Sequence, residues 1–180
     1  APVGGIRLHC VADGAPEAPL MLFVHGFPEF WYCWKQQLAE FGRDYRAVAF
    51  DLRGHNLSDK PEGIAAYRIK PLLEDLRQLI EHLTAGREDK SCVLVAHDWG
   101  GAVAWSLANQ LPQLVGKLAI INSPHPGTFW RELKSNPRQQ QASADMQHHL
   151  AAGLRPSGLK KRQVPRGDLA RVREIKLAHA

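Results

Sequence analysis

Asp98 is the residue of this sequence whose type and position are best suited to chemistry. The apolar run Cys92–Ala96 predicts a strand, and Gly101–Leu111 predicts a helix that Pro112 ends. Between them lies Ala96-His97-Asp98-Trp99-Gly100, with a small residue two positions to either side of the aspartate. Small residues there allow a tight strand-to-helix turn that pushes the middle side chain outward, which is the form of a nucleophile elbow.

A carboxylate at such a turn predicts covalent chemistry on carbon. It is ionised at neutral pH and can attack an electrophilic carbon without a base. The N-terminus of the following helix favours the anion by roughly 0.3–1 kcal/mol. Attack gives an alkyl ester, whose release needs an activated water, a base such as histidine, and donors for the oxyanion. The alternative is that Asp98 only caps the helix, since aspartate is a favoured N-cap residue.

A second loop is predicted beside this turn. The apolar run Leu20–Val24 leads directly into His25-Gly26-Phe27-Pro28. The Phe27 N–H is placed to supply one oxyanion donor, and the Trp99 N–H to supply the other. An ordinary turn built around glycine and proline is the alternative for this loop taken alone.

A third loop, Asp51–Pro61, follows the apolar run Ala47–Phe50 and has polar turn chemistry. We assign it a supporting role, and the alternative is a solvated loop with a local contact between Asp51 and Arg53. All three loops follow the carboxyl ends of predicted strands, which is where open α/β sheets bind ligands. Three such loops in order favour the chemical interpretation over the alternatives.

The elements that must position these loops are predicted from apolar patterns. Four apolar runs do not alternate with polar residues, as in strands buried on both faces of a parallel sheet. They are Leu20–Val24, Ala47–Phe50, Cys92–Ala96 and Leu118–Ile121. An earlier strand, Ile6–Val11, is expected to pair with the first of them through the turn at Asp13–Gly14.

Helices are predicted between the strands. Trp31, Trp34, Leu38 and Phe41 recur at helical spacing. A second apolar stripe lies within residues 72–83 and is opened by a proline at position 71. Strands that alternate with helices predict an α/β fold with a mostly parallel sheet and helices on both faces.

Composition is that of one ordinary globular domain. The chain has 180 residues, of which 44% are hydrophobic and 23% charged, and no apolar run approaches the ~18 residues of a membrane span. Three cysteines, Cys10, Cys33 and Cys92, lie in apolar segments and are expected to be buried thiols. With no secretory leader visible at the first residues, they predict a reducing compartment and a cytoplasmic location.

The net charge of +5 is concentrated near the end of the chain. Residues 155–180 hold eight Lys or Arg and two Asp or Glu, whereas all fourteen aromatic residues lie at or before Trp130. Such a basic segment could contact nucleic acid or anionic lipid. It has no aromatic residues for stacking and no binding motif, so we expect neither partner. We instead expect residues 154–180 to be an irregular basic tail, produced by truncation or an altered reading frame near Asp145.

Four segments together resemble the epoxide hydrolases of the α/β-hydrolase fold. They are His25–Trp34, Asp51–Gly54, His97–Gly101 and Asn122–Pro126, and the likeness covers about residues 3–143. It implies a partial α/β-hydrolase fold without its late strands and a small epoxide as substrate. No cofactor and no metal are implied.

The same resemblance implies roles for particular residues. Asp98 would open an epoxide to a glycol monoester, and the N–H groups of Phe27 and Trp99 would form the oxyanion hole. His25, Pro28 and Trp99 would contact the substrate. The resemblance also implies that the Phe27–Pro28 peptide is cis.

Related dehalogenases are the second interpretation. Haloalkane dehalogenases typically carry Asn where this chain has Phe27, and fluoroacetate dehalogenases tend to have Arg where it has Trp99. Two departures from the epoxide hydrolase pattern are small. Ala96 replaces a Gly, and Asn56 replaces another Gly, and Asn readily adopts positive φ.

The end of the chain departs more strongly. Such enzymes continue into a helical cap with tyrosines and return with an acid and a histidine, but no Tyr follows Tyr67. The later acids and histidines are Glu132, Asp145, Asp168 and Glu174, with His125, His148, His149 and His179. None follows a convincing late strand, so we assign no base and no triad acid. We expect 1–124 to be the N-terminal part of the core and 125–153 the start of the cap. A non-catalytic fragment therefore stays an alternative to an enzyme, and the oligomeric state is open.

Overall fold

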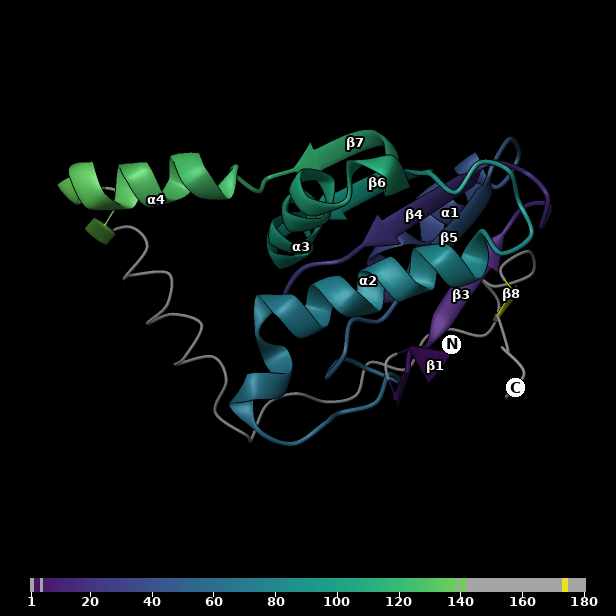
Figure 1. Ribbon diagram of the computed structural model, residues 1–180, viewed down its shortest axis with the longest axis horizontal. Coiled ribbons are helices and arrows are strands. Elements are labelled where there is room, and N and C mark those ends of the chain that lie inside the picture. Colours follow the sequence, from purple (N-terminus) through teal and green to yellow (C-terminus); the bar gives the residue numbers. More distant parts are fainter. Residues whose placement is uncertain (1, 4, 139, 142–172, 175–180) are drawn as a thin grey trace. The chain divides into compact units, whose positions relative to one another are not determined.

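The computed structural model describes residues 2–3, 5–138, 140–141 and 173–174 (Figure 1). The chain divides into two compact units, residues 1–123 with 169–180, and residues 124–168, and each is described by itself. The strands are β1 (Pro2–Val3), β2 (Ile6–Arg7), β3 (Cys10–Asp13), β4 (Leu20–Val24), β5 (Arg46–Phe50), β6 (Cys92–His97), β7 (Val115–Ile121) and β8 (Arg173–Glu174). The helices are η1 (Trp31–Trp34), α1 (Lys35–Phe41), η2 (Ile64–Tyr67), α2 (Ile69–Leu83), α3 (Asp98–Gln110), η3 (Pro112–Leu114) and α4 (Pro126–Ser135).

Six of the strands form one sheet, in the order β7-β6-β4-β5-β3-β8. Strand β4 is parallel to β5 and to β6, and β6 is parallel to β7. The predicted mostly parallel sheet with α/β alternation is therefore confirmed. Because the parallel strands share a direction, the loops after β4, β5 and β6 leave the sheet at the same end.

The predicted pairing of the first strand is wrong. Residues 6–11 form two short strands, and β3 pairs antiparallel with β5 rather than with β4. Both sides of β4 are already taken by its parallel neighbours β5 and β6. The turn after β3 uses Gly14 at φ +88°, where a Cβ would lie 2.0 Å from the Tyr45 carbonyl oxygen.

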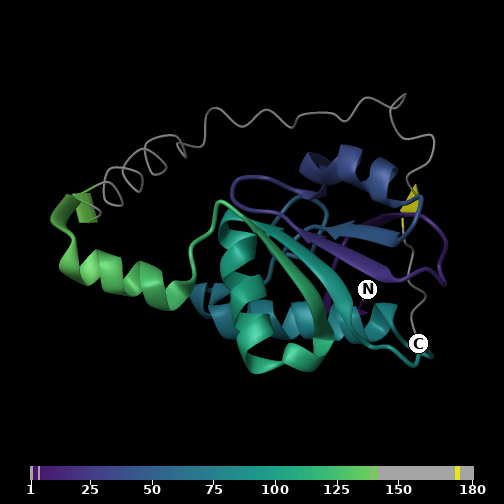
Figure 2. The ribbon, with the colours of Figure 1, turned by 90° about the horizontal axis from the view of Figure 1, so that it is seen from above.

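Alternate residues of the central strands feed two separate cores. Leu20, Leu22 and Val24 of β4 join a cluster with the apolar stripe of α2 and with Val103 of α3. Met21 and Phe23 point to the other face, where Trp31, Trp34 and Leu38 cover them. Figure 2 shows α1 on one side of the sheet and α2 with α3 on the other. This arrangement confirms helices on both faces.

Two predictions of burial are wrong. Strand β7 was expected to be buried on both faces, but most of its side chains are half-buried or exposed, and Ile121 is 47% exposed. Among the described strands it has a hydrogen-bonded neighbour on one side alone, so less of the molecule covers it. Cys33 is exposed because it lies on the outer side of η1, whereas Cys10 and Cys92 are buried as expected, and all three thiols are free.

The second unit contributes α4 to the described structure. Pro126 occupies its first turn, and the His125 Nδ1 accepts a hydrogen bond from the Gly127 N–H at 3.2 Å. Residues 139 and 142–153 of the expected cap segment, Asp145 among them, and most of the expected basic tail lie outside the described residues. Within the described part of the chain, no helix has the length and apolar character needed to cross a membrane.

Candidate active site

Asp98 lies at a strained turn between β6 and α3. Its φ is +51°, in the left-handed region that residues other than glycine rarely adopt. Such a backbone costs on the order of 1–3 kcal/mol and persists only where the surroundings impose it. The turn carries the partly exposed Asp98 side chain away from the two cores, as the sequence predicts for a nucleophile elbow.

Two glycines let the backbone segments meet at this turn. A Cβ on Gly26 would lie 2.4 Å from the Cβ of Asp98, and a Cβ on Gly100 would lie 2.4 Å from the His25 carbonyl oxygen. Neither position can hold a side chain without moving a backbone. The loop after β4 and the start of α3 therefore depend on glycine for their close contact.

One predicted oxyanion donor faces the carboxylate directly. The Phe27 N–H donates a hydrogen bond of 2.9 Å to the Asp98 Oδ1, across 71 positions of sequence. Trp99 is the second residue of α3, so its N–H has no acceptor within the helix. The Trp99 side chain is 65% exposed, and the Phe27–Pro28 peptide is cis, as the resemblance implied.

His25 is the first residue of the loop after β4. Its ring is fully buried, its Nδ1 donates to the Gly26 carbonyl oxygen at 2.7 Å, and its Nε2 accepts the Leu52 N–H at 3.0 Å. Burial lowers the pKa of His25 to about 4, so the ring is neutral at pH 7. Both nitrogens are thus engaged with backbone, so His25 holds the loop, and the substrate contact expected of it stays a prediction.

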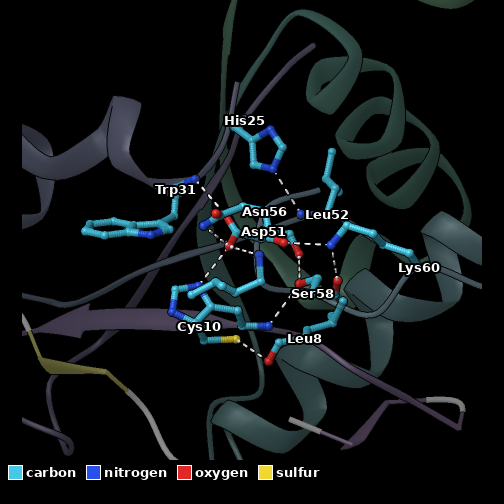
Figure 3. Close-up of polar contacts among 11 residues, drawn as sticks. Leu8, Cys10, His25, Trp31, Asp51, Leu52, Asn56, Ser58 and Lys60 are labelled. Atoms are coloured by element: carbon cyan, nitrogen blue, oxygen red, sulfur yellow. Dashed lines mark hydrogen bonds and ion pairs between the residues drawn. The ribbon is translucent and has the colours of Figure 1, made fainter. Parts of the chain in front are cut away.

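The loop after β5 is organised by Asp51 rather than by an Asp51–Arg53 contact (Figure 3). The buried Asp51 carboxylate accepts hydrogen bonds from the Trp31 N–H at 2.9 Å and from the Asn56 Nδ2 at 2.9 Å. The His9 Nδ1 lies 2.8 Å from the same carboxylate. Asn56 adopts φ +38°, so the prediction that Asn can replace Gly there is confirmed.

Arg53 pairs with a carboxylate that the sequence did not suggest. Its Nε and Nη2 donate to the two oxygens of Asp75 at 2.5 and 2.6 Å, and its Nη1 donates to the Ala66 carbonyl oxygen. Burial raises the pKa of Asp75, against the opposing effect of the guanidinium. The local Asp51–Arg53 contact of the alternative interpretation is not formed, because α2 brings the Asp75 carboxylate to the guanidinium and the Asp51 oxygens are bound by other groups.

An apolar cavity of about 300 Å³ adjoins the turn. Its lining includes Phe27 and Trp99 from the predicted site and Val103 from α3, together with Tyr67, Ile69 and Leu72 from η2 and α2. The last three were not predicted as site residues. The sequence carries no separate signal for them: in the structure Ile69 is 46% exposed at the start of α2, whereas the buried apolar residues of α2 come later in the helix.

Glu29 is a second residue that the sequence analysis did not single out. Its Oε2 lies 3.1 Å from the Nδ1 of His97, which directly precedes Asp98. This contact holds the side chain of the residue that directly precedes Asp98. The signal for Glu29 was its position directly after the Pro28 of the second loop.

The late acids and histidines supply no described partner for Asp98. Glu174 lies in β8, beside β3 and four strands from β6, and His125 caps α4 in the second unit. Asp145, Asp168, His148, His149 and His179 lie outside the described residues. Among the residues that are described, no cluster of three or more His, Cys, Asp or Glu side chains could hold a metal ion.

Comparisons with known proteins agree with this geometry. Residues 19–155 match the alpha/beta hydrolase fold family. "Epoxide hydrolase 1" of Caenorhabditis elegans is 52% identical over 128 residues, which are 71% of this chain and 31% of that protein. "Epoxide hydrolase 3" of Xenopus tropicalis is 48% identical over 75% of this chain and 36% of its own length. The chain thus spans about a third of the length of these relatives.

Solved structures give the same result. A Bacillus megaterium epoxide hydrolase in complex with an inhibitor superimposes with a TM-score of 0.77 and 45% identity, over 86% of this chain and 54% of that one. A mutant of an epoxide hydrolase from the same organism, complexed with its product (R)-3-[1]naphthyloxy-propane-1,2-diol, gives a TM-score of 0.74 and 48% identity. That match covers 81% of this chain and 49% of the solved one.

Proposed function

We propose a function from the premise that this chain belongs to the α/β-hydrolase fold family, and that the relatives it matches within that family are epoxide hydrolases. In this proposal it carries the nucleophile and the oxyanion donors of an epoxide hydrolase. The observation that carries it is the 2.9 Å hydrogen bond from the Phe27 N–H to the Asp98 Oδ1, at a turn with positive φ.

The first step is nucleophilic attack by Asp98. Because its Oδ1 is held by the Phe27 N–H, we assign the attack to Oδ2. A bond forms between Oδ2 and an epoxide carbon, and the carbon–oxygen bond of the ring breaks. The ring oxygen leaves with the electron pair and takes a proton from water or from an acid that the described residues do not supply. The product is a glycol monoester of Asp98.

The second step releases the diol. Water attacks the carbonyl carbon of the ester and loses a proton to a base. Negative charge then develops on Oδ1, the oxygen that faces the Phe27 N–H. The carbon–oxygen bond to the glycol breaks as the tetrahedral intermediate collapses, and the diol leaves with a proton. We assign no residue as that base.

The substrate class follows from the cavity. Its lining is largely aliphatic and aromatic, so it fits an apolar substituent on the epoxide. The Bacillus megaterium enzyme bound to a naphthyloxy-propanediol supports an aryl ether epoxide as a probe. The three free thiols agree with a reducing compartment, and a cytoplasmic location is part of this proposal.

Intact-protein mass spectrometry tests the proposal with 1-naphthyl glycidyl ether, the epoxide whose hydration gives that diol. We expect one adduct per chain, mapped to Asp98 by peptide sequencing. Asp98→Asn should lose at least 90% of the labelling, because an amide oxygen is a far weaker nucleophile.

The matched control for this experiment is Asp44→Asn, which changes an exposed aspartate that lies away from the turn. It should label like the wild type. Labelling that survives in Asp98→Asn, or a wild-type chain that forms no adduct, would contradict the proposed nucleophile.

A further inference from the structure

Two adjacent residues at the end of β5 hold both ends of the loop that carries the oxyanion donor. At one end, the Leu52 N–H donates to the His25 Nε2 at 3.0 Å. At the other end, the Asp51 Oδ1 accepts the Trp31 N–H at 2.9 Å. The loop between these contacts contains Phe27, whose N–H reaches Asp98. Figure 3 shows these two contacts, with the His25 ring above Leu52 and Trp31 to the left of Asp51.

We call these two contacts, Trp31 N–H to Asp51 and Leu52 N–H to His25, the clamp of the loop. The Asp51 end of the clamp is itself held by several hydrogen bonds. Asp51 is fully buried, and its second oxygen, Oδ2, is occupied by the Asn56 Nδ2 and lies 2.8 Å from the His9 Nδ1. Its backbone is also tied, because its N–H donates to the His9 carbonyl oxygen and its carbonyl oxygen accepts the Ser58 hydroxyl at 2.6 Å. With Oδ2 and the backbone engaged, Oδ1 has little freedom to leave the Trp31 N–H.

The His25 end is equally determined. The ring is fully buried and neutral, so Nε2 is an acceptor and Nδ1 carries the proton given to the Gly26 carbonyl oxygen. This second bond fixes the peptide that leads into Phe27. The two ends together leave the Phe27 N–H little room to turn away from Asp98.

We infer that Asp51 and His25 are positioning residues, which act through the segment 25–31 to aim the Phe27 N–H at the oxygen that becomes the oxyanion. The inference rests on the proposed function for its chemical meaning. It also predicts a difference between the two steps. Attack by Oδ2 builds no charge on Oδ1, whereas cleavage of the ester does, so loss of the clamp should slow cleavage far more than ester formation.

The test separates the two steps in the full chain. The ester is formed with 1-naphthyl glycidyl ether, the free epoxide is removed, and hydroxylamine is added. The hydroxylamine nitrogen attacks the ester carbonyl, the carbon–oxygen bond breaks, and the diol leaves with a proton, so Asp98 becomes a hydroxamate. Intact mass follows both ester formation and this cleavage, and neither needs a histidine base.

We expect Asp51→Ala and His25→Leu to slow cleavage at least tenfold while ester formation changes less than threefold. Asp51→Asn retains an oxygen for the Trp31 N–H and should fall between Asp51→Ala and the wild type. Leu79→Ala is the control for lost stability alone, since Leu79 is buried on α2 without polar contacts to the segment. It should leave the ratio of the two rates unchanged.

Equal slowing of both steps in the clamp variants, as for a merely destabilised chain, would overturn the inference. Amide hydrogen exchange decides it independently of any reaction. The wild-type amides of Phe27 and Trp31 should exchange at least tenfold more slowly than in an unstructured peptide, and His25→Leu should release them selectively. Unprotected amides in the folded wild type would refute the clamp, even if no ester forms and the proposed function fails.

Discussion

The Asp98 carboxylate can accept the Phe27 N–H for two reasons at the scale of single residues. Two glycines leave room for the backbones to approach, and the ring nitrogens of His25 are both hydrogen-bonded to backbone. Glycine at positions 26 and 100 removes the Cβ atoms that would separate the two segments. At His25, neutrality makes the ring both a donor and an acceptor, so that this buried side chain joins the backbones of Gly26 and Leu52. At this scale, protonation of one buried ring is enough to oppose folding.

Acid should therefore destabilise the chain through His25. The pKa of His25 is about 4 in the folded protein, against 6.5 for the ordinary side chain, so the unfolded state binds a proton more readily. The stability that the neutral ring contributes is complete above pH 6.5 and is lost as pH falls to about 4. By linkage it amounts to about 3 kcal/mol.

Urea denaturation between pH 7.5 and 4 measures this effect. The free energy of unfolding should fall more steeply with acidification in the wild type than in His25→Leu, which has no ring to protonate. Parallel pH profiles for the two proteins would show that His25 titrates normally in the fold.

At the scale of elements, the parallel strands bring three loops to one end of the sheet, and contacts then join these loops to one another and to the helices. The loop after β4 meets the start of α3, the loop after β5 meets the loop after β4, and Arg53 meets α2 through Asp75. The strand-to-helix turn of β6 and α3 depends on the first of these contacts. Its geometry can be tested by adding one methyl group at Gly100.

Gly100→Ala should disrupt the turn. The new Cβ would lie 2.4 Å from the His25 carbonyl oxygen and 2.7 Å from that of Val24, and neither backbone can move freely. We expect a loss of about 2 kcal/mol or more in the free energy of unfolding, measured with urea, together with slower adduct formation at Asp98.

Gly127→Ala is the matched control, because the same methyl group on α4 would meet its nearest atoms at 3.4 Å. It should be neutral or slightly stabilising, since alanine favours a helix by roughly 0.5–1 kcal/mol over glycine. Equal effects of the two substitutions would mean that close packing at the turn is unimportant.

At the scale of the whole molecule, the described sheet ends on one side in β7, which is hydrogen-bonded to β6 alone. The chain spans about a third of its curated relatives and about half of the solved structures it matches. The partly exposed β7 and the exposed Trp99 and Ile121 form surface in the described part of this chain. Exposed apolar strand edges favour association between copies.

We therefore expect the isolated chain to associate as its concentration rises, measured by size-exclusion chromatography with light scattering. Ala119→Lys places a charge on the exposed face of β7 and should shift the population toward monomer. Ala65→Lys adds the same charge at an exposed position of η2 and should leave association unchanged. A wild-type chain that is monomeric at every concentration would contradict this expectation.

The sequence by itself determined the local features of this protein. Apolar runs predict β4, β5 and β6, the apolar stripe predicts α2, and the small residues around Asp98 predict a turn that exposes it. These features depend on neighbours a few positions away, whose spacing is written in the chain.

The tertiary structure decided the partners. It placed β3 beside β5, Arg53 against Asp75, and His25 against the Leu52 N–H, and it joined η2 and α2 into the wall of the cavity. A buried polar group pairs with whichever donor or acceptor the packed elements bring within reach, and sequence spacing does not rank partners that lie far apart along the chain.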